Sequence, residues 1–459
     1  MINKSKILEI INKQKEFFNN GNTLNINFRL EQLKILRKAV IEFQPQIFDA
    51  LDKDLNKSNF ESYETEVGLI LDEIRFCIKH LKKWAKPKKV KTSLVNQPGK
   101  SSIYYEPYGI SLIISPWNYP FQLLISPLIG AISAGNCTIL KPSELAENTS
   151  IIIKQMISKI FNDEYITVIE GGIETNKFLL EQQWDFIFFT GSIQVGKIVM
   201  SACSKYLTPF ILELGGKNPT IVTNNANLDI AAKKITWGKF INAGQTCNAP
   251  DYLLVHKSVK LKLINYLKKY ITEFYGKNPL DSIDYPKIIN KNHFERLSNL
   301  MKKGNIIFGG YLDQEKNKIS PTLLDNITLN DPIMKEEIFG PLLPIIEFQN
   351  IEDIFNIIKN NPNPLCFYLF TNNKKIEKEI VKRLKAGGCT INDTIMHIVG
   401  PYIPFGGINT SGIGRYHGKA SFKAFSNQKG ILKKFNFFDN PLRYPPYKDK
   451  LKYLKWFLK

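Results

Sequence analysis

Three side chains in this sequence have the chemistry needed for covalent catalysis at a carbonyl carbon. Cys247 ends the segment Asn242-Ala243-Gly244-Gln245-Thr246-Cys247, where backbone N–H groups beside the sulfur would lower its pKa and favour the thiolate. Glu213 lies in the apolar run Phe210-Ile211-Leu212-Glu213-Leu214, where desolvation would raise its pKa towards that of a general base. The amide of Asn118 would stabilise an oxyanion. A packed thiol, a structural acid and a turn asparagine are the alternatives.

A loop that suits a phosphate follows a predicted strand at Phe189-Thr190-Gly191-Ser192-Ile193-Gln194-Val195-Gly196. Gly191 and Gly196 occupy the first and last glycine positions of the dinucleotide motif G-x-G-x-x-G, whereas Ile193 replaces the middle one. The free N–H groups of the following helix and the Ser192 hydroxyl would bind a pyrophosphate. Ser192 acting only as a helix cap is the alternative, and the loop alone leaves both open.

A second candidate cofactor contact lies at Lys141-Pro142-Ser143-Glu144, directly after an apolar run. The carboxyl end of a parallel strand is where dinucleotide ribose is usually held. Glu144 would bond a 2′-hydroxyl and repel a 2′-phosphate, which favours NAD. Its alternative role is a solvated first-turn glutamate that the helix dipole stabilises.

Short apolar runs alternate with helix-length segments, a pattern typical of parallel sheets covered on both faces. The strands expected before residue 215 are residues 110–115, 137–141, 166–170, 185–190 and 209–214. Those expected after it are residues 220–222, 252–255, 342–348, 366–370 and 389–391. Residues 28–48 and 63–84 have helical apolar spacing. The sequence therefore predicts an N-terminal helical layer, a doubly wound nucleotide-binding domain and a second α/β domain.

Composition excludes several other classes. The formal net charge of +20 comes with abundant Asn and Ile along the whole chain, and no nucleic-acid motif accompanies it, so we expect no nucleic-acid partner. The six cysteines have no C-x-x-C or metal-finger spacing, so we expect no metal and a reducing compartment. Met1-Ile2-Asn3-Lys4-Ser5-Lys6 lacks a secretory apolar region, which favours a cytoplasmic protein. Prolines divide the uncharged residues 108–140 into strand, turn and buried helix rather than a membrane span.

Seven motifs in order resemble the aldehyde dehydrogenase superfamily. They are Ser115-Pro116-Trp117-Asn118-Tyr119-Pro120-Phe121, Leu140-Lys141-Pro142-Ser143-Glu144, Phe189-Thr190-Gly191-Ser192, Leu212-Glu213-Leu214-Gly215-Gly216-Lys217, Gly244-Gln245-Thr246-Cys247, Glu336-Glu337-Ile338-Phe339-Gly340-Pro341 and Pro404-Phe405-Gly406-Gly407. Finer features resemble the class 3 branch, which includes fatty aldehyde dehydrogenases: Ala249-Pro250-Asp251-Tyr252, Asn392-Asp393-Thr394-Ile395-Met396-His397, Gly414-Arg415-Tyr416-His417-Gly418-Lys419 and Arg443-Tyr444-Pro445-Pro446. Arg415 is one local departure from that branch.

The resemblance implies a role for each candidate residue. Cys247 would be the nucleophile, Asn118 with the Cys247 backbone N–H the oxyanion hole, and Glu213 the base that activates water. The implied cofactor contacts are Lys141 and Glu144 at the adenosine ribose, Ser192 with Gly191 and Gly196 at the pyrophosphate, Glu337 at the nicotinamide ribose, and Phe339 and Trp117 packed nearby. NAD is the expected cofactor, with NADP open because the ribose carboxylate of class 3 enzymes can swing aside. Tyr119 would line the substrate tunnel or be a packed aromatic.

The resemblance also implies the fold, an aldehyde dehydrogenase-like α/β chain with a Rossmann-type domain. We expect residues 1–96 and 107–213 to form the NAD(P)-binding domain and residues 214–412 the catalytic domain. Residues 97–106 and 413–459 would be bridging or oligomerisation segments and a C-terminal arm. Class 3 enzymes are typically dimers, and residues 101–105 are the candidate bridging strand.

The expected function is oxidation of medium- or long-chain aliphatic or aromatic aldehydes to acids. A CoA-acylating dehydrogenase is the alternative enzyme, and a non-catalytic binding or structural protein on the same fold is the alternative class. The basic and aromatic tail, residues 448–459, would contact an anionic membrane surface or pack as an arm on protein, which we favour.

Overall fold

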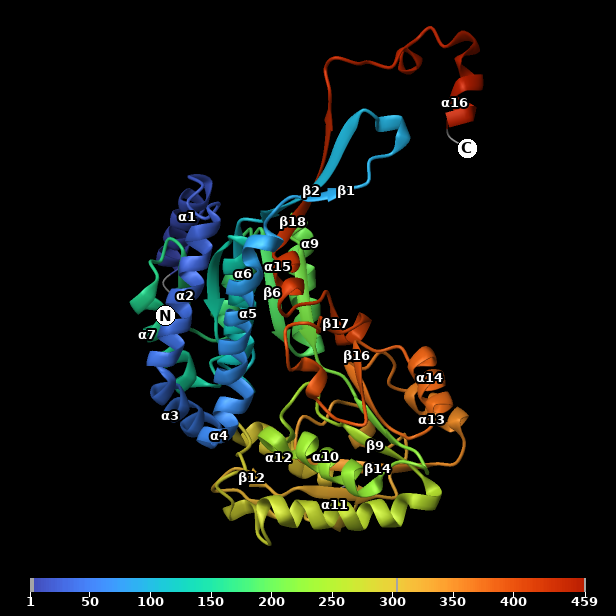
Figure 1. Cartoon of the computed structure of the whole chain (residues 1–459). Coiled ribbons are helices and arrows are strands. Elements are labelled where there is room, and N and C mark those ends of the chain that lie inside the picture. The colour runs from blue at the N-terminus through green and yellow to red at the C-terminus, as the bar shows by residue number, and fades with distance from the viewer. Residues whose placement is uncertain (1–3, 303, 458–459) are drawn as a thin grey trace.

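The buried hydrophobic side chains form two clusters, and each cluster joins one sheet of short apolar strands to the helices packed on it (Figure 1). The structure is a computed structural model that describes residues 4–302 and 304–457. The parts of the sequence predictions that fall on residues 1–3 and 458–459 lie outside the described residues.

The first sheet has the strand order β17-β7-β6-β3-β4-β5 within the described residues. Its strands are β3 (Ile110–Ile114), β4 (Cys137–Lys141), β5 (Ile166–Val168), β6 (Phe186–Gly191), β7 (Phe210–Leu214) and β17 (Gly412–Ile413). All neighbours are parallel except β17, which pairs antiparallel with β7 and sets Gly412 opposite Glu213. The five strands expected before residue 215 are confirmed. Their continuous apolar runs suit strands that are buried on both faces.

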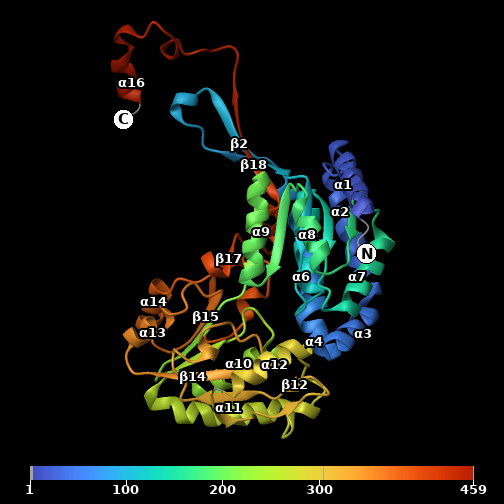
Figure 2. The same ribbon diagram turned by 180° about the vertical axis from the view of Figure 1, so that it is seen from behind.

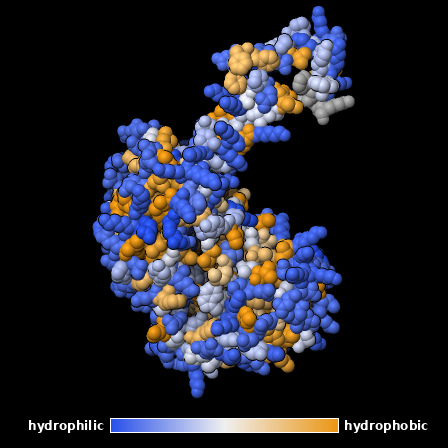
Figure 3. Space-filling model, viewed as in Figure 1, coloured by the Kyte–Doolittle hydropathy of each residue, from blue (hydrophilic) through white to orange (hydrophobic). Residues whose placement is uncertain are grey.

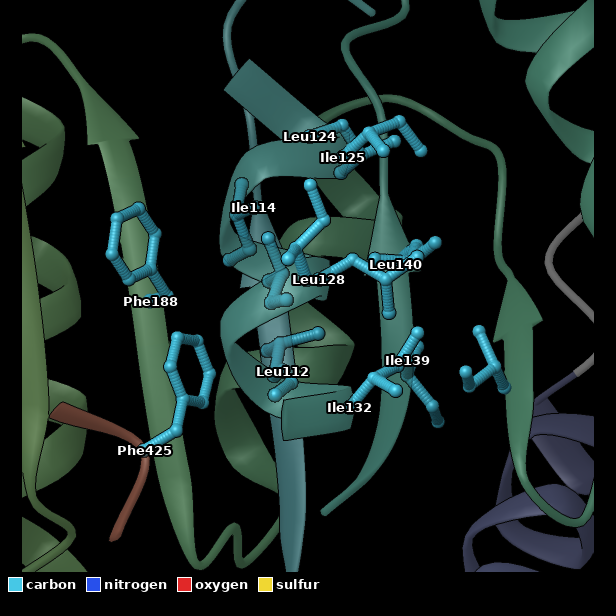
Figure 4. Close-up of a cluster of buried hydrophobic side chains, with 14 of the residues drawn as sticks. Leu112, Ile114, Leu124, Ile125, Leu128, Ile132, Ile139, Leu140, Phe188 and Phe425 are labelled. Carbon is cyan, nitrogen blue, oxygen red and sulfur yellow. The ribbon is translucent and has the colours of Figure 1, made fainter. Parts of the chain in front are cut away.

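Helices cover both faces of this sheet. They are α6 (Gln122–Ala134), α7 (Glu147–Ile160), α8 (Ile173–Glu181) and α9 (Ile193–Tyr206). The crossovers β3-α6-β4 and β6-α9-β7 run in opposite directions along the sheet, so the right-handed rule places α6 and α9 on opposite faces. Leu128 and Ile132 of α6 pack on Leu112 of β3 and Ile139 of β4 (Figure 4).

The uncharged residues 108–140 therefore form β3, a turn, the buried helix α6 and β4, as predicted. Every residue of α6 is buried, including Pro127. Among the described residues, no helix combines the length and the apolar character needed to cross a membrane.

An N-terminal helical layer packs on α6 and α7, and Figure 2 shows it from behind. It contains α1 (Lys4–Asn19), α2 (Ile26–Glu42), α3 (Gln44–Leu55), α4 (Asn59–Ser62), the π-helical turn η1 (Tyr63–Val67) and α5 (Gly68–Trp84). The prediction of one helix over residues 28–48 is wrong. The helix breaks at Phe43 because the ring of Pro45 would clash with the preceding turn, and Pro45 instead lies in the first turn of α3.

The second sheet has the order β10-β13-β14-β9-β8-β15-β16. Its strands are β8 (Pro219–Val222), β9 (Tyr252–His256), β10 (Asn305–Phe308), β13 (Thr322–Asp325), β14 (Leu342–Phe348), β15 (Cys366–Phe370) and β16 (Gly388–Ile391). The five strands expected after residue 214 are confirmed. The helices here are α10 (Leu228–Phe240), α11 (Lys260–Tyr275), α12 (Lys291–Met301), α13 (Ile351–Ile358) and α14 (Lys374–Arg383), and a small hairpin joins β11 (Leu312–Asp313) to β12 (Lys318–Ile319).

A third sheet projects from the rest of the chain (Figures 1 and 2). It consists of β1 (Lys88–Val90), β2 (Gly99–Pro107) and β18 (Ser426–Lys434), and β18 follows α15 (Lys419–Ala424). The predicted strand at residues 101–105 lies in β2, which pairs along its whole length with β18. Beyond β18 the chain continues as an arm that ends in α16 (Leu451–Phe457).

Candidate active site

The segment before Cys247 has a backbone that few residue types tolerate. It follows α10, and Asn242, Ala243 and Gly244 have φ values of 51°, 50° and 73°. Asn and Gly adopt this left-handed region most readily. A Cβ atom on Gly244 would lie 2.3 Å from the Gly340 backbone oxygen, so only glycine fits there. The turn carries the chain to the half-buried Cys247.

Asn118 lies directly against this turn. Its side-chain Nδ2 donates a 3.0 Å hydrogen bond to the backbone oxygen of Gln245, and Asn242 Nδ2 donates a 2.8 Å bond to the backbone oxygen of Asn118. Asn118 Oδ1 is buried and has no hydrogen-bond partner among the described residues. The fold therefore brings the predicted oxyanion donor, 129 positions before Cys247 in the sequence, to residues 242–247, the Cys247 turn.

The surroundings of Cys247 act on its pKa in two directions. The backbone N–H groups of Asn248 and Cys247 lower it, as the sequence suggested. Desolvation and the negative charges of Glu337 and Glu213 outweigh them and raise the pKa to about 12. The expectation of a lowered pKa is therefore wrong for the free chain, because the sequence reveals the neighbouring N–H groups but not the facing carboxylates.

Glu213 is a buried carboxylate in β7, opposite Thr190 of β6 and Gly412 of β17. Neither of its oxygens has a hydrogen-bond partner among the described residues. Desolvation raises its pKa well above the ordinary value, while the charge of Arg415 lowers it. The direction agrees with the expected base. An acid that is buried without partners is costly for stability and is typical of a functional group.

Tyr119 lies next to the Cys247 turn. Its hydroxyl shares a 2.6 Å hydrogen bond with Thr246, and Lys57 Nζ lies 4.4 Å from its ring centroid. These contacts show a packed aromatic ring, and a place for Tyr119 in the wall of a substrate tunnel stays a prediction.

A buried charge cluster beneath the turn was not predicted. Lys57 forms a 2.6 Å ion pair with Glu66, and both side chains are fully buried. Glu66 Oε2 accepts the N–H of Phe121 at 2.9 Å, next to the start of α6. Glu61 Oε1 accepts the N–H of Asn242 at 2.9 Å, and desolvation raises the Glu61 pKa to about 7. The cluster ties the N-terminal helical layer to both Asn118 and the Cys247 turn.

The predicted ribose and phosphate residues lie at the carboxyl ends of β4 and β6. Lys141 is buried, donates to the Pro142 oxygen at 2.6 Å and lies 3.5 Å from Glu144 Oε2. Ser192 caps α9 by accepting the N–H of Val195 at 3.3 Å. A Cβ on Gly196 would lie 2.6 Å from Leu214 Cδ2, so this glycine allows α9 to approach β7.

Glu337 acts electrostatically on Cys247, and Phe339 and Trp117 form a ring pair. The Glu337 carboxylate lies so close to Gly215 that a Cβ there would be 1.8 Å from it, and desolvation raises its pKa to about 8. The Trp117 ring contacts Phe339 edge-on with centroids 5.3 Å apart, and His293, which was not predicted, lies 5.0 Å from Trp117. A single histidine in a helix carries no sequence signal for such a contact.

These residues fit a dinucleotide. Among the described residues, the buried polar atoms Ser115 Oγ, Thr190 Oγ1 and Glu337 Oε1 have no protein partner, and all three lie at or beside the carboxyl ends of the strands. A buried polar atom without a partner indicates a ligand or water. Together with the buried cation Lys141 and the other N–H groups at the N-terminus of α9, they match the donors and acceptors that ribose and phosphate require.

Comparisons with known proteins identify the family of the chain. A sequence profile of the aldehyde dehydrogenase family matches residues 1–431. The chain belongs to the aldehyde dehydrogenase family. It is 49% identical over 97% of both chains to the 4,4'-diaponeurosporen-aldehyde dehydrogenase of Staphylococcus aureus. It is 42% identical, over 97% of this chain and 99% of the other, to the mouse aldehyde dehydrogenase described as dimeric and NADP-preferring.

The solved structures show the same relationship. A substrate-bound structure of Staphylococcus aureus AldH superimposes with a TM-score of 0.97, at 48% identity and with 99% of each chain covered. Family 3 members are among the relatives, including member H1 of Arabidopsis thaliana at 44% identity, over 97% of this chain and 93% of the other. The resemblance to the class 3 branch and the predicted fold are therefore confirmed. As a member of this family, the protein is an NAD(P)-dependent oxidoreductase that oxidises aldehydes.

Proposed function

We propose that this enzyme oxidises apolar aldehydes, medium- or long-chain aliphatic or aromatic, to carboxylic acids through covalent intermediates on Cys247. The observation that carries the proposal is the hydrogen bond from Asn118 Nδ2 to the Gln245 oxygen, which brings an amide donor to the nucleophile turn. The unpaired oxygens of Glu213 supply the second requirement, a base within the electrostatic reach of the sulfur.

The chemistry proceeds in two stages on the sulfur. The Cys247 thiolate adds to the aldehyde carbon, a C–S bond forms, and the oxyanion accepts hydrogen bonds from Asn118 Nδ2 and the Cys247 backbone N–H. NAD(P)+ supplies the acceptor for the hydride that leaves this carbon, which turns the thiohemiacetal into a thioester. Glu213 then takes a proton from water, the water oxygen attacks the thioester carbon, and the C–S bond breaks to release the acid and the thiolate.

We infer the cofactor roles from the positions of the side chains. Lys141 and Glu144 would hold the adenosine ribose, and Ser192 and the N–H groups of α9 the pyrophosphate, with Gly191 and Gly196 allowing the close approach. Glu337 would hold the nicotinamide ribose, next to the ring pair of Trp117 and Phe339. Glu144 favours NAD, yet its side chain is 39% exposed and bonded only weakly to Lys141, so it can turn away from a 2′-phosphate.

A substrate panel tests the proposal. Hexanal, dodecanal and benzaldehyde are assayed with NAD and NADP in parallel, and reduced cofactor should form with at least one of them without CoA. Formation with CoA only would favour the CoA-acylating alternative. No activity with any aldehyde, together with alkylation of Cys247 that the cofactor does not modulate, would support a non-catalytic protein.

We further propose a cytoplasmic homodimer in which β2 and β18 bridge two subunits. In each subunit, residues 1–96 and 107–213 would form the NAD(P)-binding domain and residues 214–412 the catalytic domain. The apolar side chains of the arm support this: Phe437, Tyr447, Leu451 and Trp456 are at least half exposed, and Figure 3 shows hydrophobic side chains among hydrophilic ones on the projection. Light scattering of the full chain and of a chain ending at residue 425 measures the assembly. The full chain should be a dimer and the truncated chain a monomer.

The arm offers a peripheral membrane contact as an alternative partner. Lys450, Lys452 and Lys455 alternate with Leu451, Tyr453, Leu454 and Trp456 in and beside α16. Sedimentation with anionic liposomes should fall on deletion of residues 448–459. Unchanged sedimentation would exclude the tail as the contact.

A further inference from the structure

Arg415 lies beside Glu213 without binding it. A Cβ atom on Gly406 would lie 2.9 Å from Glu213 Oε1 and 3.0 Å from Arg415 Cδ, so both side chains flank the same glycine. Neither oxygen of Glu213 has a hydrogen-bond partner among the described residues, so Arg415 does not bond to the carboxylate directly. The guanidinium Nη1 instead donates to the backbone oxygens of Gly407 and of Gly414, the latter at 2.6 Å.

This anchoring keeps a positive charge near Glu213 and leaves both carboxylate oxygens free. A direct ion pair would occupy the lone pairs that must receive a proton from water. A charge held at one side stabilises the ionised carboxylate through space, and a poorly solvated site strengthens this effect. The backbone oxygens that hold Arg415 flank Gly406, so the charge is fixed with respect to the carboxylate.

The other groups around Glu213 do not supply a positive charge. Opposite Glu213 in the sheet, β6 places Thr190 and β17 places Gly412, and neither titrates. Leu214, the next residue of β7, packs against Gly196 of α9. The titratable groups that interact electrostatically with Glu213, apart from Arg415, are the Cys247 thiol and the Tyr416 phenol, which are neutral or negative. Arg415 is therefore the cation that acts on Glu213 within the described part of the chain.

We propose that Arg415 is a positioning residue for hydrolysis, whose fixed charge favours the ionised form of Glu213, the form that can accept a proton from water. This inference rests on the proposed role of Glu213 as the base. It concerns the second stage only, so the first stage, acylation of Cys247, should not depend on Arg415.

The test follows the loss of the acyl group from Cys247. The enzyme is mixed with dodecanal and NAD in a single turnover, quenched at intervals and measured as intact protein by mass spectrometry from pH 5.5 to 9.5. The wild-type rate constant should rise with pH to a plateau as Glu213 ionises. Arg415→Gln keeps amide donors for the two carbonyl oxygens but lacks the charge, and it should move the midpoint up by roughly one pH unit with a similar plateau. Arg415→Lys should restore the wild-type midpoint, and Arg37→Gln, an exposed arginine of α2, should not change it.

Two results would overturn the inference. An unchanged midpoint in Arg415→Gln would show that the charge has no effect, and an equal shift in Arg415→Lys would show that shape rather than charge matters. Glu213→Gln separates this failure from failure of the proposed function. If Glu213→Gln deacylates at the wild-type rate, Glu213 is not the base. If it is slow and Arg415→Gln has the wild-type midpoint, only the role of Arg415 is wrong.

Discussion

The side-chain amide of Asn118 donates a 3.0 Å hydrogen bond to the backbone oxygen of Gln245, two residues before Cys247. The turn returns a bond, because Asn242 Nδ2 donates to the Asn118 backbone oxygen at 2.8 Å. Two reciprocal hydrogen bonds therefore join the segment that follows β3 to the Cys247 turn. This arrangement holds one amide N–H in the turn, and the second N–H is the one that we propose donates to the oxyanion.

Replacing Asn118 should impair catalysis without abolishing it. Asn118→Ala removes the proposed oxyanion donor, and loss of one such donor typically reduces the rate about 10²- to 10³-fold. The Cys247 backbone N–H remains, so some activity should persist. Steady-state kinetics measures the effect, with the exposed Asn360→Ala as the control. A variant with wild-type kcat/KM would exclude Asn118 from the oxyanion hole.

The Cys247 thiol should react slowly in the free enzyme at neutral pH. Its pKa is raised to about 12, and the negative charge of Glu337 is the largest cause after desolvation. Glu337→Gln removes that charge, so the thiolate is stabilised and the pKa falls. Because the Glu337 pKa is about 8, the difference should appear above pH 8. Alkylation by iodoacetamide, followed by peptide mass spectrometry, measures it. Alkylation of the wild type that is already maximal at pH 7 would contradict the raised pKa.

Glu213→Gln should separate stability from activity. The folded-state pKa of Glu213 is raised, so its burial destabilises the fold increasingly as pH rises above about 4.3, where an unfolded glutamate ionises. The melting temperature of the variant, relative to the wild type, should therefore rise between pH 5 and pH 8. The rate of hydrolysis should fall about 10²- to 10⁴-fold. A variant that becomes relatively less stable over this pH range would show that Glu213 has a favourable partner.

Lys57→Met should lower the free energy of unfolding of the protein. It leaves the fully buried Glu66 without its ion-pair partner, which typically costs about 3–5 kcal/mol. The double variant Lys57→Met with Glu66→Gln should recover part of that loss, because no buried charge remains. Thermal unfolding measures both. Lys53→Met breaks an exposed pair in α3 and should have little effect. A double variant less stable than Lys57→Met would contradict the explanation.

The sequence predicts the strands well because their signal is local. The run Cys137–Lys141 and its neighbours are apolar without interruption, which few other structures allow. The sequence identifies Cys247, Glu213 and Asn118 as candidates because the three residues and the family motifs occur together, since no one position is sufficient. The break at Phe43 also had a local signal in Pro45, which outweighs the helical spacing of residues 28–48.

Other features depend on contacts that only the fold creates. Lys57 and Glu66 resemble solvated residues of a helical segment, and nothing local shows that both are buried. The pKa of Cys247 was predicted in the wrong direction because Glu337, 90 positions away, faces the sulfur. Arg415 was visible as a departure from the class 3 pattern, but its relation to Glu213 required the pairing of β17 with β7.

The most direct test of the central claim is to find the acyl group on Cys247. Dodecanal and NAD are mixed with enzyme in a single turnover, the reaction is quenched in acid, and peptides are analysed by mass spectrometry. The acyl mass should lie on the peptide that contains Cys247, and Cys247→Ala should form neither the adduct nor NADH. An adduct on another cysteine, or NADH formation by Cys247→Ala at the wild-type rate, would contradict the assignment of Cys247 as the nucleophile.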